Sequence, residues 1–119
     1  MIHYHYIEVE PVKIGGEAKD ASSRQLIGEA EGATVTMTMI EVQPGGNTLS
    51  FTHHGEHTVY ILEGTGIINE ENGVSPLNQG LFIFIKPNER YMFKNTGNRL
   101  LRFLIIEPIL HNDEKSNKV

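Results

Sequence analysis

Histidine offers the most chemistry in this chain, and three histidines lie close together. His53, His54 and His57 all fall within the segment Phe51–His57. Imidazole binds Zn, Fe, Mn, Ni and Cu, and because it titrates near neutral pH it can also act as an acid or a base. The chain has no cysteine, which excludes thiolate metal sites and disulfides. The segment therefore predicts either a metal centre or metal-free acid–base chemistry.

The elements that position these histidines are predicted to be strands. Residues 33–43 alternate apolar side chains with threonine, which is the period of a strand with one buried face. Residues 81–85 are apolar on both faces, so we expect this strand to be covered on both sides. Similar patterns predict further strands, giving a full set over residues 33–43, 58–63, 66–69, 74–77, 81–85, 91–94 and 100–107.

Turn-forming residues separate these strands at short intervals. Pro44–Asn47 and Lys86–Glu89 predict turns, whereas Asn72–Gly73 and Thr96–Asn98 predict hairpins. Many short strands joined by such turns indicate an all-β sandwich or barrel.

The remaining segments complete a single domain over residues 1–119. Residues 3–9 alternate and predict an N-terminal strand within residues 1–14. We expect this strand at an interface with a second subunit, because an unpaired apolar edge invites uncontrolled pairing. Residues 15–23 are polar and predict a loop, and residues 111–119 predict a loose tail.

The segment that contains the three histidines resembles the first motif of the cupin family. That motif runs Gly, five residues, His, one residue, His, three or four residues, Glu, six residues and Gly. Gly45 and Gly64 match its two ends, with every spacing kept. His53 stands at the second histidine position. His57 stands at the glutamate position, where some small cupins also carry histidine, and Phe51 replaces the first histidine.

A second segment resembles the second cupin motif, which ends on a histidine and an asparagine. Gly80 and Asn95 match the two ends of that motif. Tyr91 replaces its histidine and Lys86 its proline. Asn88 takes a glycine position, where its tolerance of the left-handed backbone conformation makes the exchange natural.

The resemblance implies a cupin-type jelly-roll barrel, also called a double-stranded β-helix, with a core over about residues 33–107 and a ligand pocket inside. Residues two apart on a strand share a face, so Phe51 and His53 would both point inward. Tyr91 would approach from a neighbouring strand. The expected pocket residues are Phe51, His53, His57, Tyr91, Met37 and Met39, and the favoured alternative for the two methionines is plain core.

The resemblance also implies a metal-ligand set in which two of the four usual positions are altered. His53 and His57 are the expected imidazole ligands, and Tyr91 could join them as a phenolate, which favours ferric iron. The implied cofactor is a divalent or ferric transition metal (Fe, Mn, Ni or Zn), and the alternative is a pocket without metal. His54, next to His53, is expected to point outward.

Three functions follow from these alternatives. The first is a metal-dependent enzyme, an oxygenase, isomerase or lyase, that acts on a small polar or aromatic molecule. The second is a metal-free small-molecule-binding protein whose pocket is lined by Phe51 and Tyr91. The third is a metal-free enzyme that uses pocket histidines as acid and base.

Charge and hydropathy restrict the partners. The formal net charge is -5 and there is no Lys/Arg-rich run, which argues against nucleic acid as a partner. No apolar run approaches the roughly 20 residues of a membrane helix, which argues against a membrane partner. The expected partners are a small-molecule ligand and a second copy in a homodimer, and the expected location is the cytoplasm.

Overall fold

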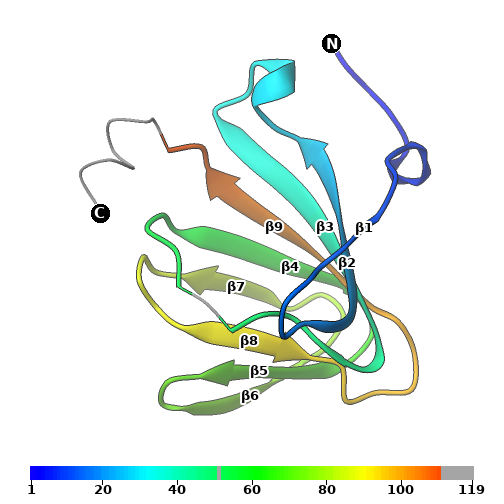
Figure 1. Cartoon of the computed structure of the whole chain (residues 1–119). Helices are drawn as coiled ribbons and strands as arrows, with labels where there is room; N and C mark the ends of the chain where they lie inside the picture. Colours follow the sequence, from blue (N-terminus) through cyan, green and yellow to red (C-terminus); the bar gives the residue numbers. More distant parts are fainter. Residues whose placement is uncertain (51, 111–119) are drawn as a thin grey trace.

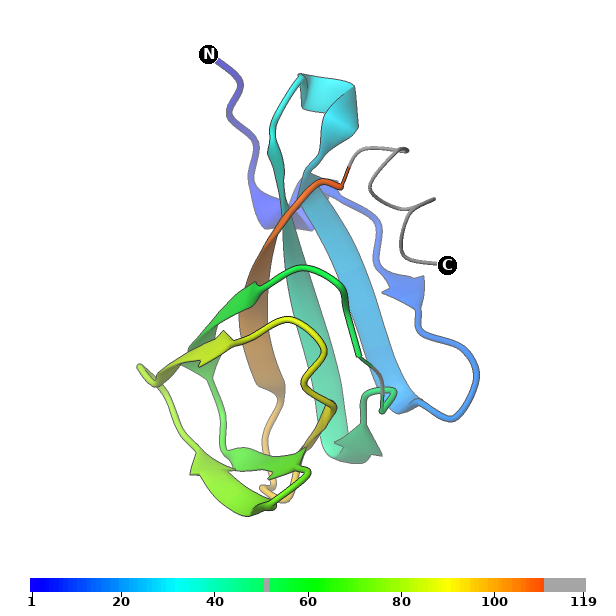
Figure 2. The same cartoon turned by 90° about the vertical axis from the view of Figure 1, so that its left-hand side faces the viewer.

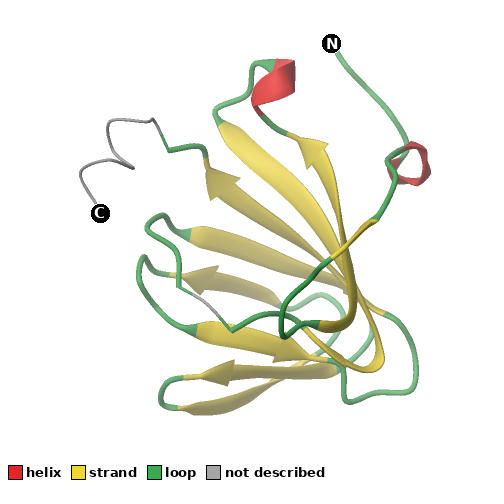
Figure 3. Cartoon of the chain, viewed as in Figure 1, coloured by secondary structure: helices red, strands yellow, loops and turns green. Residues whose placement is uncertain are grey.

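Antiparallel strands are the main regular structure of the chain, as Figure 3 shows. In the computed structural model, which describes residues 1–50 and 52–110, they form one sheet of nine strands. This confirms the predicted all-β class. The elements are η1 (Tyr6–Glu8), β1 (Val12–Lys13), β2 (Lys19–Ile27), η2 (Glu29–Glu31), β3 (Val35–Asn47), β4 (His57–Glu63), β5 (Gly66–Glu70), β6 (Gly73–Leu77), β7 (Phe82–Ile85), β8 (Tyr91–Lys94) and β9 (Leu101–Pro108), where η denotes a 3-10 helix.

The sheet curls into a half-barrel of the kind expected for a jelly roll. Its strand order is β6-β5-β8-β3-β9-β4-β7, with β2 also paired to β3 and β1 to β2. The long strands β2, β3 and β9 lie side by side with β4 and β7, and β8, β5 and β6 curl round to face them (Figures 1 and 2). We call these two parts the long wall and the short wall.

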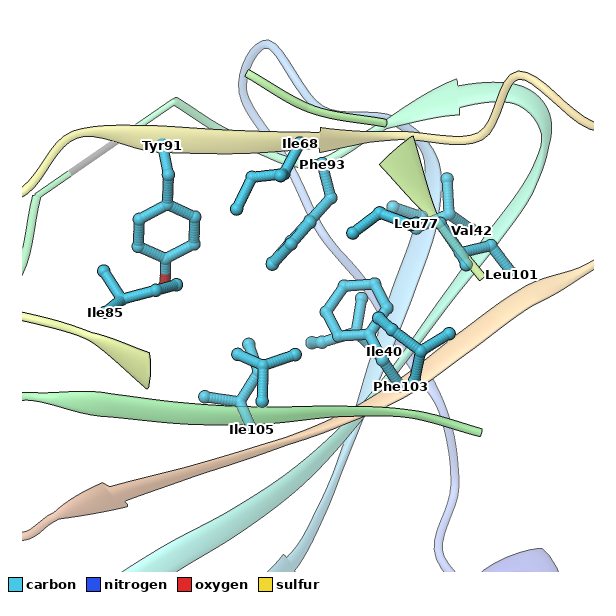
Figure 4. Close-up of a cluster of buried hydrophobic side chains, with 13 residues drawn as sticks. Ile40, Val42, Ile68, Leu77, Ile85, Tyr91, Phe93, Leu101, Phe103 and Ile105 are labelled. Carbon is cyan, nitrogen blue, oxygen red and sulfur yellow. The ribbon is translucent and has the colours of Figure 1, made fainter. Parts of the chain in front are cut away.

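The hydrophobic core fills the space between the two walls. Tyr91, Ile68 and Phe93 of the short wall point toward Phe103 and Ile105 of the long wall (Figure 4). Strand alternation explains this arrangement, because every second residue of β9 and of β4 faces inward. The fully buried side chains that result are Phe93, Phe103, Ile61, Leu77, Leu101, His57, Val42 and Val59.

The two walls meet where Pro44–Asn47 was predicted to form a turn, and here the prediction is wrong. Strand β3 continues to Asn47, but its register with β2 shifts between Ala21 and Lys19. Gly45 has a φ of 82°, and a Cβ on Gly46 would lie 2.5 Å from a backbone oxygen of β2. The glycines therefore let β3 bend and pass from β9 to β8 without ending.

Asn95 fixes this corner from the opposite side. Its side chain is buried and donates hydrogen bonds to the backbone oxygens of Val42 and Arg99, each at 2.8 Å. Its Oδ1 accepts from the Gly97 amide at 2.9 Å. One side chain thus connects β3 to the loop that follows β8, which gives a physical reason for asparagine at the end of the second motif.

Three other segments differ from their predictions. Residues 15–23 are not all loop, because β2 begins at Lys19 and pairs with β3 through an alternating polar pattern. Residues 3–9 form no strand; they contain η1, whose first turn is capped by the side chains of His5 and Glu8. Thr96–Asn98 does not close a hairpin, because β8 pairs with β5 and β3 and not with β9. The predicted tail at 111–119 lies outside the described residues.

The N-terminal segment is held on the outer face of the long wall by a charged clasp. Arg24 donates to the backbone oxygens of Tyr6 and Val9, and both Arg24 and Arg102 lie over the Tyr6 ring. Glu41 accepts from both guanidinium groups at 2.8 Å. Burial opposes ionisation of Glu41, but hydrogen bonds from the two arginines outweigh it and keep the pKa of Glu41 low.

Among the described helices, none has the length and apolarity needed to cross a membrane.

Candidate metal centre

His57 is the most deeply buried polar residue of the site. It opens β4, and alternation places it on the inward face together with Val59 and Ile61. Only 2% of the residue is exposed. Its Nδ1 is hydrogen-bonded to the Tyr91 hydroxyl, and its Nε2 lies 2.7 Å from Oε2 of Glu107. Both ring nitrogens of His57 therefore have partners, one from each wall.

Glu107 supplies the carboxylate, and sequence reasoning missed it. It ends the inward row Leu101, Phe103, Ile105 on β9, so a charged side chain continues an apolar face. That break in the pattern was the available signal. The hydrogen bond from His57 lowers the pKa of Glu107 most, burial opposes it, and the charges of His57 and His53 and the Thr36 hydroxyl lower it further. Glu107 is thus an ionised acceptor near neutral pH.

His53 approaches from the loop before β4. Its Nδ1 lies 3.8 Å from Oε2 of Glu107, and its ring centroid is 4.0 Å from that of His57. The Asn88 amide donates to the His53 oxygen at 2.7 Å, and Asn88 has a φ of 69°, the left-handed conformation expected at its motif position. Burial and the neighbouring His57 lower the pKa of His53. A neutral imidazole, the form that binds metals, is therefore favoured there.

His53, His57 and Glu107 form a group that could hold a metal ion. One donor atom from each residue can be chosen so that all lie within 4.8 Å of one another. Two imidazoles and one carboxylate form a donor set that suits iron and other divalent first-row metals. The 2.7 Å between His57 Nε2 and Glu107 Oε2 is close to the roughly 3 Å between neighbouring ligands whose bonds to a metal are about 2.1 Å. The residues therefore fit a metal.

Tyr91 contacts Nδ1 of His57, whereas the Glu107 carboxylate contacts Nε2. Burial raises the pKa of the Tyr91 phenol, and the charge of Glu107 raises it further. The phenol is therefore protonated and can donate to Nδ1 of His57, which leaves the Nε2 proton for the carboxylate of Glu107. Because the two nitrogens lie on opposite edges of the ring, Tyr91 is not placed to share a metal with Nε2 of His57. The expected phenolate ligand is replaced in this geometry by Glu107.

A cavity of about 520 Å³ opens beside the donor group. His53 and Glu107 reach it from inside, and the exposed His54 lies at its rim. The cavity is lined by Gln25, Glu29, Thr36, Thr52, His53, His54, Gly55, Glu107, Pro108, Ile109 and Leu110. A ligand in this cavity would therefore meet polar groups next to the donor atoms.

The other expected pocket residues do not gather here. Met37 and Met39 lie on the outer face of β3, because Ile40 and Val42 occupy its inward face. Met37 lines a separate cavity of about 480 Å³ beneath the N-terminal segment, so the expectation that the two methionines line the histidine pocket is wrong. Phe51 lies outside the described residues.

A second, more apolar cavity of about 400 Å³ touches the Tyr91 ring from between the walls. Its lining includes the aliphatic side chains of Ile68, Ile83 and Ile85. It also includes the charged residues Glu70, Glu89 and Arg90. Tyr91 lines this second cavity and Glu107 lines the polar one, and the buried His57 is hydrogen-bonded to both residues.

Comparison with known proteins identifies the family to which this fold and site belong. The model of the cupin domain family matches residues 38–107, more than half of the chain. The chain therefore belongs to the cupin domain family.

Two proteins of known structure share the fold over almost the whole chain. The polyketide cyclase RemF from Streptomyces resistomycificus is 28% identical, with a TM-score of 0.82 over 99% of this chain and 92% of that one. A predicted oxalate decarboxylase from Thermotoga maritima is 25% identical, with a TM-score of 0.81 over 92% of this chain and 100% of that one. An oxalate-binding protein of Thermotoga maritima is 31% identical over 68 residues, which span 56% of each sequence. The match thus spans little more than half the length of this curated relative.

Proposed function

We propose that this cupin is a metal-dependent enzyme, an oxygenase, isomerase or lyase, that acts on a small polar or aromatic molecule. The observation that carries the proposal is the grouping of one donor atom each from His53, His57 and Glu107 within 4.8 Å. The proposed ligand set departs from the usual cupin set, since a carboxylate from β9 joins the two imidazoles. A bound metal would supply Lewis-acid or redox chemistry at this point.

The protein residues then have separate tasks. Glu107 and His57 provide a preformed pair of donors, because strand pairing of β9 and β4 fixes their backbones. With a metal bound, Nε2 would carry no proton, so Nδ1–H would donate to the Tyr91 hydroxyl oxygen and hold the His57 ring with Nε2 facing Glu107. The Thr52 and Gln25 side chains line the adjacent cavity, where they can orient a polar substrate.

The substrate class is supported by the cavities and by the relatives. The polar cavity beside His53 suits a small acid, and the names of two relatives, an oxalate-binding protein and a predicted oxalate decarboxylase, agree with it. The apolar cavity against Tyr91 suits a ring, and the polyketide cyclase agrees with that. Both remain within the proposed class of small polar or aromatic molecules.

One observation favours the metal-free alternative. His57 already has a hydrogen-bond partner at each ring nitrogen, so the site is satisfied without an ion. In that case His57, Glu107 and Tyr91 would be fixed polar groups in the pocket of a small-molecule-binding protein.

Elemental analysis of tag-free protein decides between the two. We expect about one Fe, Mn, Ni or Zn per chain, or a rise in melting temperature when one of these metals is added after chelation. Glu107→Gln, which keeps the shape of the side chain, should abolish the bound metal. His54→Ala is the matched control, because His54 is exposed, adjacent in sequence and outside the donor group. Absence of metal and of any thermal shift would overturn the proposal in favour of the metal-free pocket.

A further inference from the structure

A cavity of about 480 Å³ lies under the N-terminal segment, on the outer face of the sheet. Residues 2–6 and 9 form one side of it, and the ends of β2 and β3 with the turn between them form the other. The N-terminal segment runs beside this β2–β3 hairpin in Figures 1 and 2. We call this space the outer cavity. Its volume is within the roughly 300–1,000 Å³ that is typical of small-molecule sites.

The outer cavity is distinct from the polar cavity beside the candidate metal centre. Thr36 and Met37 are neighbours on β3, so their side chains face opposite sides of the sheet. Thr36 lines the polar cavity, whereas Met37 lines the outer one. Glu29 and Glu31, the two ends of η2, are divided in the same way, and Gln25 borders both cavities. The hairpin therefore stands between two separate spaces.

Both walls of the outer cavity are held in place without a ligand. Arg24 donates to the backbone oxygens of Tyr6 and Val9, at 3.3 Å and 2.8 Å. The cap of η1 adds a hydrogen bond from the His5 amide to Glu8 at 2.8 Å. On the opposite wall, β2 is paired with β3. The cavity is thus formed in advance, which lowers the cost of ordering the protein around a ligand.

Aromatic and aliphatic side chains make up most of the lining, and several of them are in contact with water. Tyr4 is 76% exposed, Ile2 60% and Ile27 37%. Covering such apolar surface is favourable, and an aromatic ring covers it at little cost in conformational freedom. The Met37 thioether also favours an aromatic neighbour. The lining therefore suits a flat aromatic ligand.

Two polar groups select what such a ring can carry. His5 accepts a hydrogen bond from the Ile7 amide through Nδ1, so the proton of the neutral imidazole is on Nε2, which is a donor. Glu31 accepts from the Gly28 amide through Oε1 at 2.7 Å, which leaves Oε2 to accept from a ligand. No lysine or arginine is among the described residues that line the cavity. The cavity therefore favours a ligand that donates a hydrogen bond and carries no negative charge.

We propose that the outer cavity is a second binding site, and that its ligand is a small planar aromatic molecule with a hydroxyl or amino group and no negative charge. The ring lies against Met37 and Tyr4, and its polar group donates to Glu31. This site is independent of the proposed metal chemistry, because its lining residues are not members of the donor group.

Tyramine and 4-hydroxyphenylacetate test the proposal, because they share one phenol ring and differ in the charge of the side chain. The full chain, labelled with methyl-¹³C methionine, reports binding through Met37, which lines the cavity, and Met92 on β8 serves as the internal reference. Met37→Leu assigns the signal. We expect tyramine to shift the Met37 signal, but not that of Met92, with a Kd of about 1 mM or below. The anion should bind about fivefold more weakly or worse.

The two glutamates of η2 provide a matched pair of variants. Glu31→Gln keeps an oxygen for the Gly28 amide but removes the charge, so it should abolish the preference for tyramine over the anion. Glu29→Gln, on the same turn but on the polar cavity, should retain that preference. Ala33→Phe places a ring in the outer cavity and should weaken tyramine binding by about tenfold or more, with an unchanged far-UV spectrum as evidence of folding.

Four results would count against the second site. One is a Met37 signal that stays in place up to about 10 mM tyramine. Another is a shift at Met92 without one at Met37, which would place the probe on the short wall. A third is a preference that Glu29→Gln abolishes as fully as Glu31→Gln. The last is binding that disappears when a chelator removes bound metal, which would assign the probe to the metal centre.

Discussion

Tyr91 and Glu107 hold the His57 ring from its two opposite edges. The Tyr91 hydroxyl, from the short wall, binds Nδ1, and the Glu107 carboxylate, from the long wall, lies 2.7 Å from Nε2. Without a metal, the ionised Glu107 carboxylate favours the tautomer of this buried imidazole that carries its proton on Nε2. The relationship also connects the two walls of the barrel through polar side chains that lie beside the apolar core.

Tyr91→Phe should weaken metal binding without disturbing the barrel. The substitution keeps the ring but removes the hydrogen bond that orients His57, and loss of such a support commonly lowers metal affinity by about 10- to 100-fold. The measurement is a calorimetric titration with Zn or Mn of protein from which a chelator has removed any metal. Tyr4→Phe, at an exposed N-terminal position, is the control. A lower melting temperature with unchanged metal affinity would show that the hydroxyl only stabilises the fold.

Glu107 should make stability depend on acidity. Its folded-state pKa lies below the ordinary value of 4.5, chiefly because of the hydrogen bond from His57. Its contribution is therefore fully present above pH 4.5 and is lost as pH falls through the lower folded-state pKa. Urea unfolding of wild type and Glu107→Gln between about pH 3 and 7 should show a stability difference that shrinks toward acid. A difference that stays constant would contradict the assignment.

Asn95→Ala should destabilise the corner between the walls. The change leaves the buried oxygens of Val42 and Arg99 without their donor, and we expect the free energy of unfolding to fall by about 3 kcal/mol. Chemical denaturation measures this directly. Asn98→Ala, three residues away and exposed, should change stability by less than about 0.5 kcal/mol. Equal effects from both substitutions would argue against the role given to Asn95.

Gly46→Ala should be costly for a steric reason. Its Cβ would lie 2.5 Å from the Lys19 oxygen, a backbone atom that cannot move without breaking the β2–β3 pairing. We expect a loss of about 2 kcal/mol or more in thermal or chemical unfolding. Gly15→Ala, where nothing lies within 4 Å, serves as the control. A variant as stable as the wild type would show that the corner can relax.

Much of the fold was predictable because strand patterning is local. Alternation in residues 33–43 and the apolar run at 81–85 sufficed to predict β3 and β7. The strand predicted for residues 3–9 does not form. These residues form η1 instead, where the side chains of His5 and Glu8 cap the helix. The turn predicted at Pro44–Asn47 is wrong because proline and glycine, which are typical of turns, also permit a bend within a continuous strand.

The candidate site was predictable in part. His53 and His57 followed from motif spacing, and the structure brings them together. Glu107 did not, because it joins them only through the pairing of β9 with β4, which spacing within one motif cannot reveal. Tyr91 was placed correctly near His57, but which edge of the imidazole it binds is a three-dimensional fact.

The pairing of β3 and β4 with β9 has a consequence for biosynthesis. Val35 pairs with Pro108, and His57 meets Glu107, fifty positions later in the chain. In a growing polypeptide, the edges of β3 and β4 that pair with β9 therefore stay unpaired until nearly all of the described residues have been translated. Among the described strands β9 is translated last, so the donor group is complete only when β9 inserts between β3 and β4.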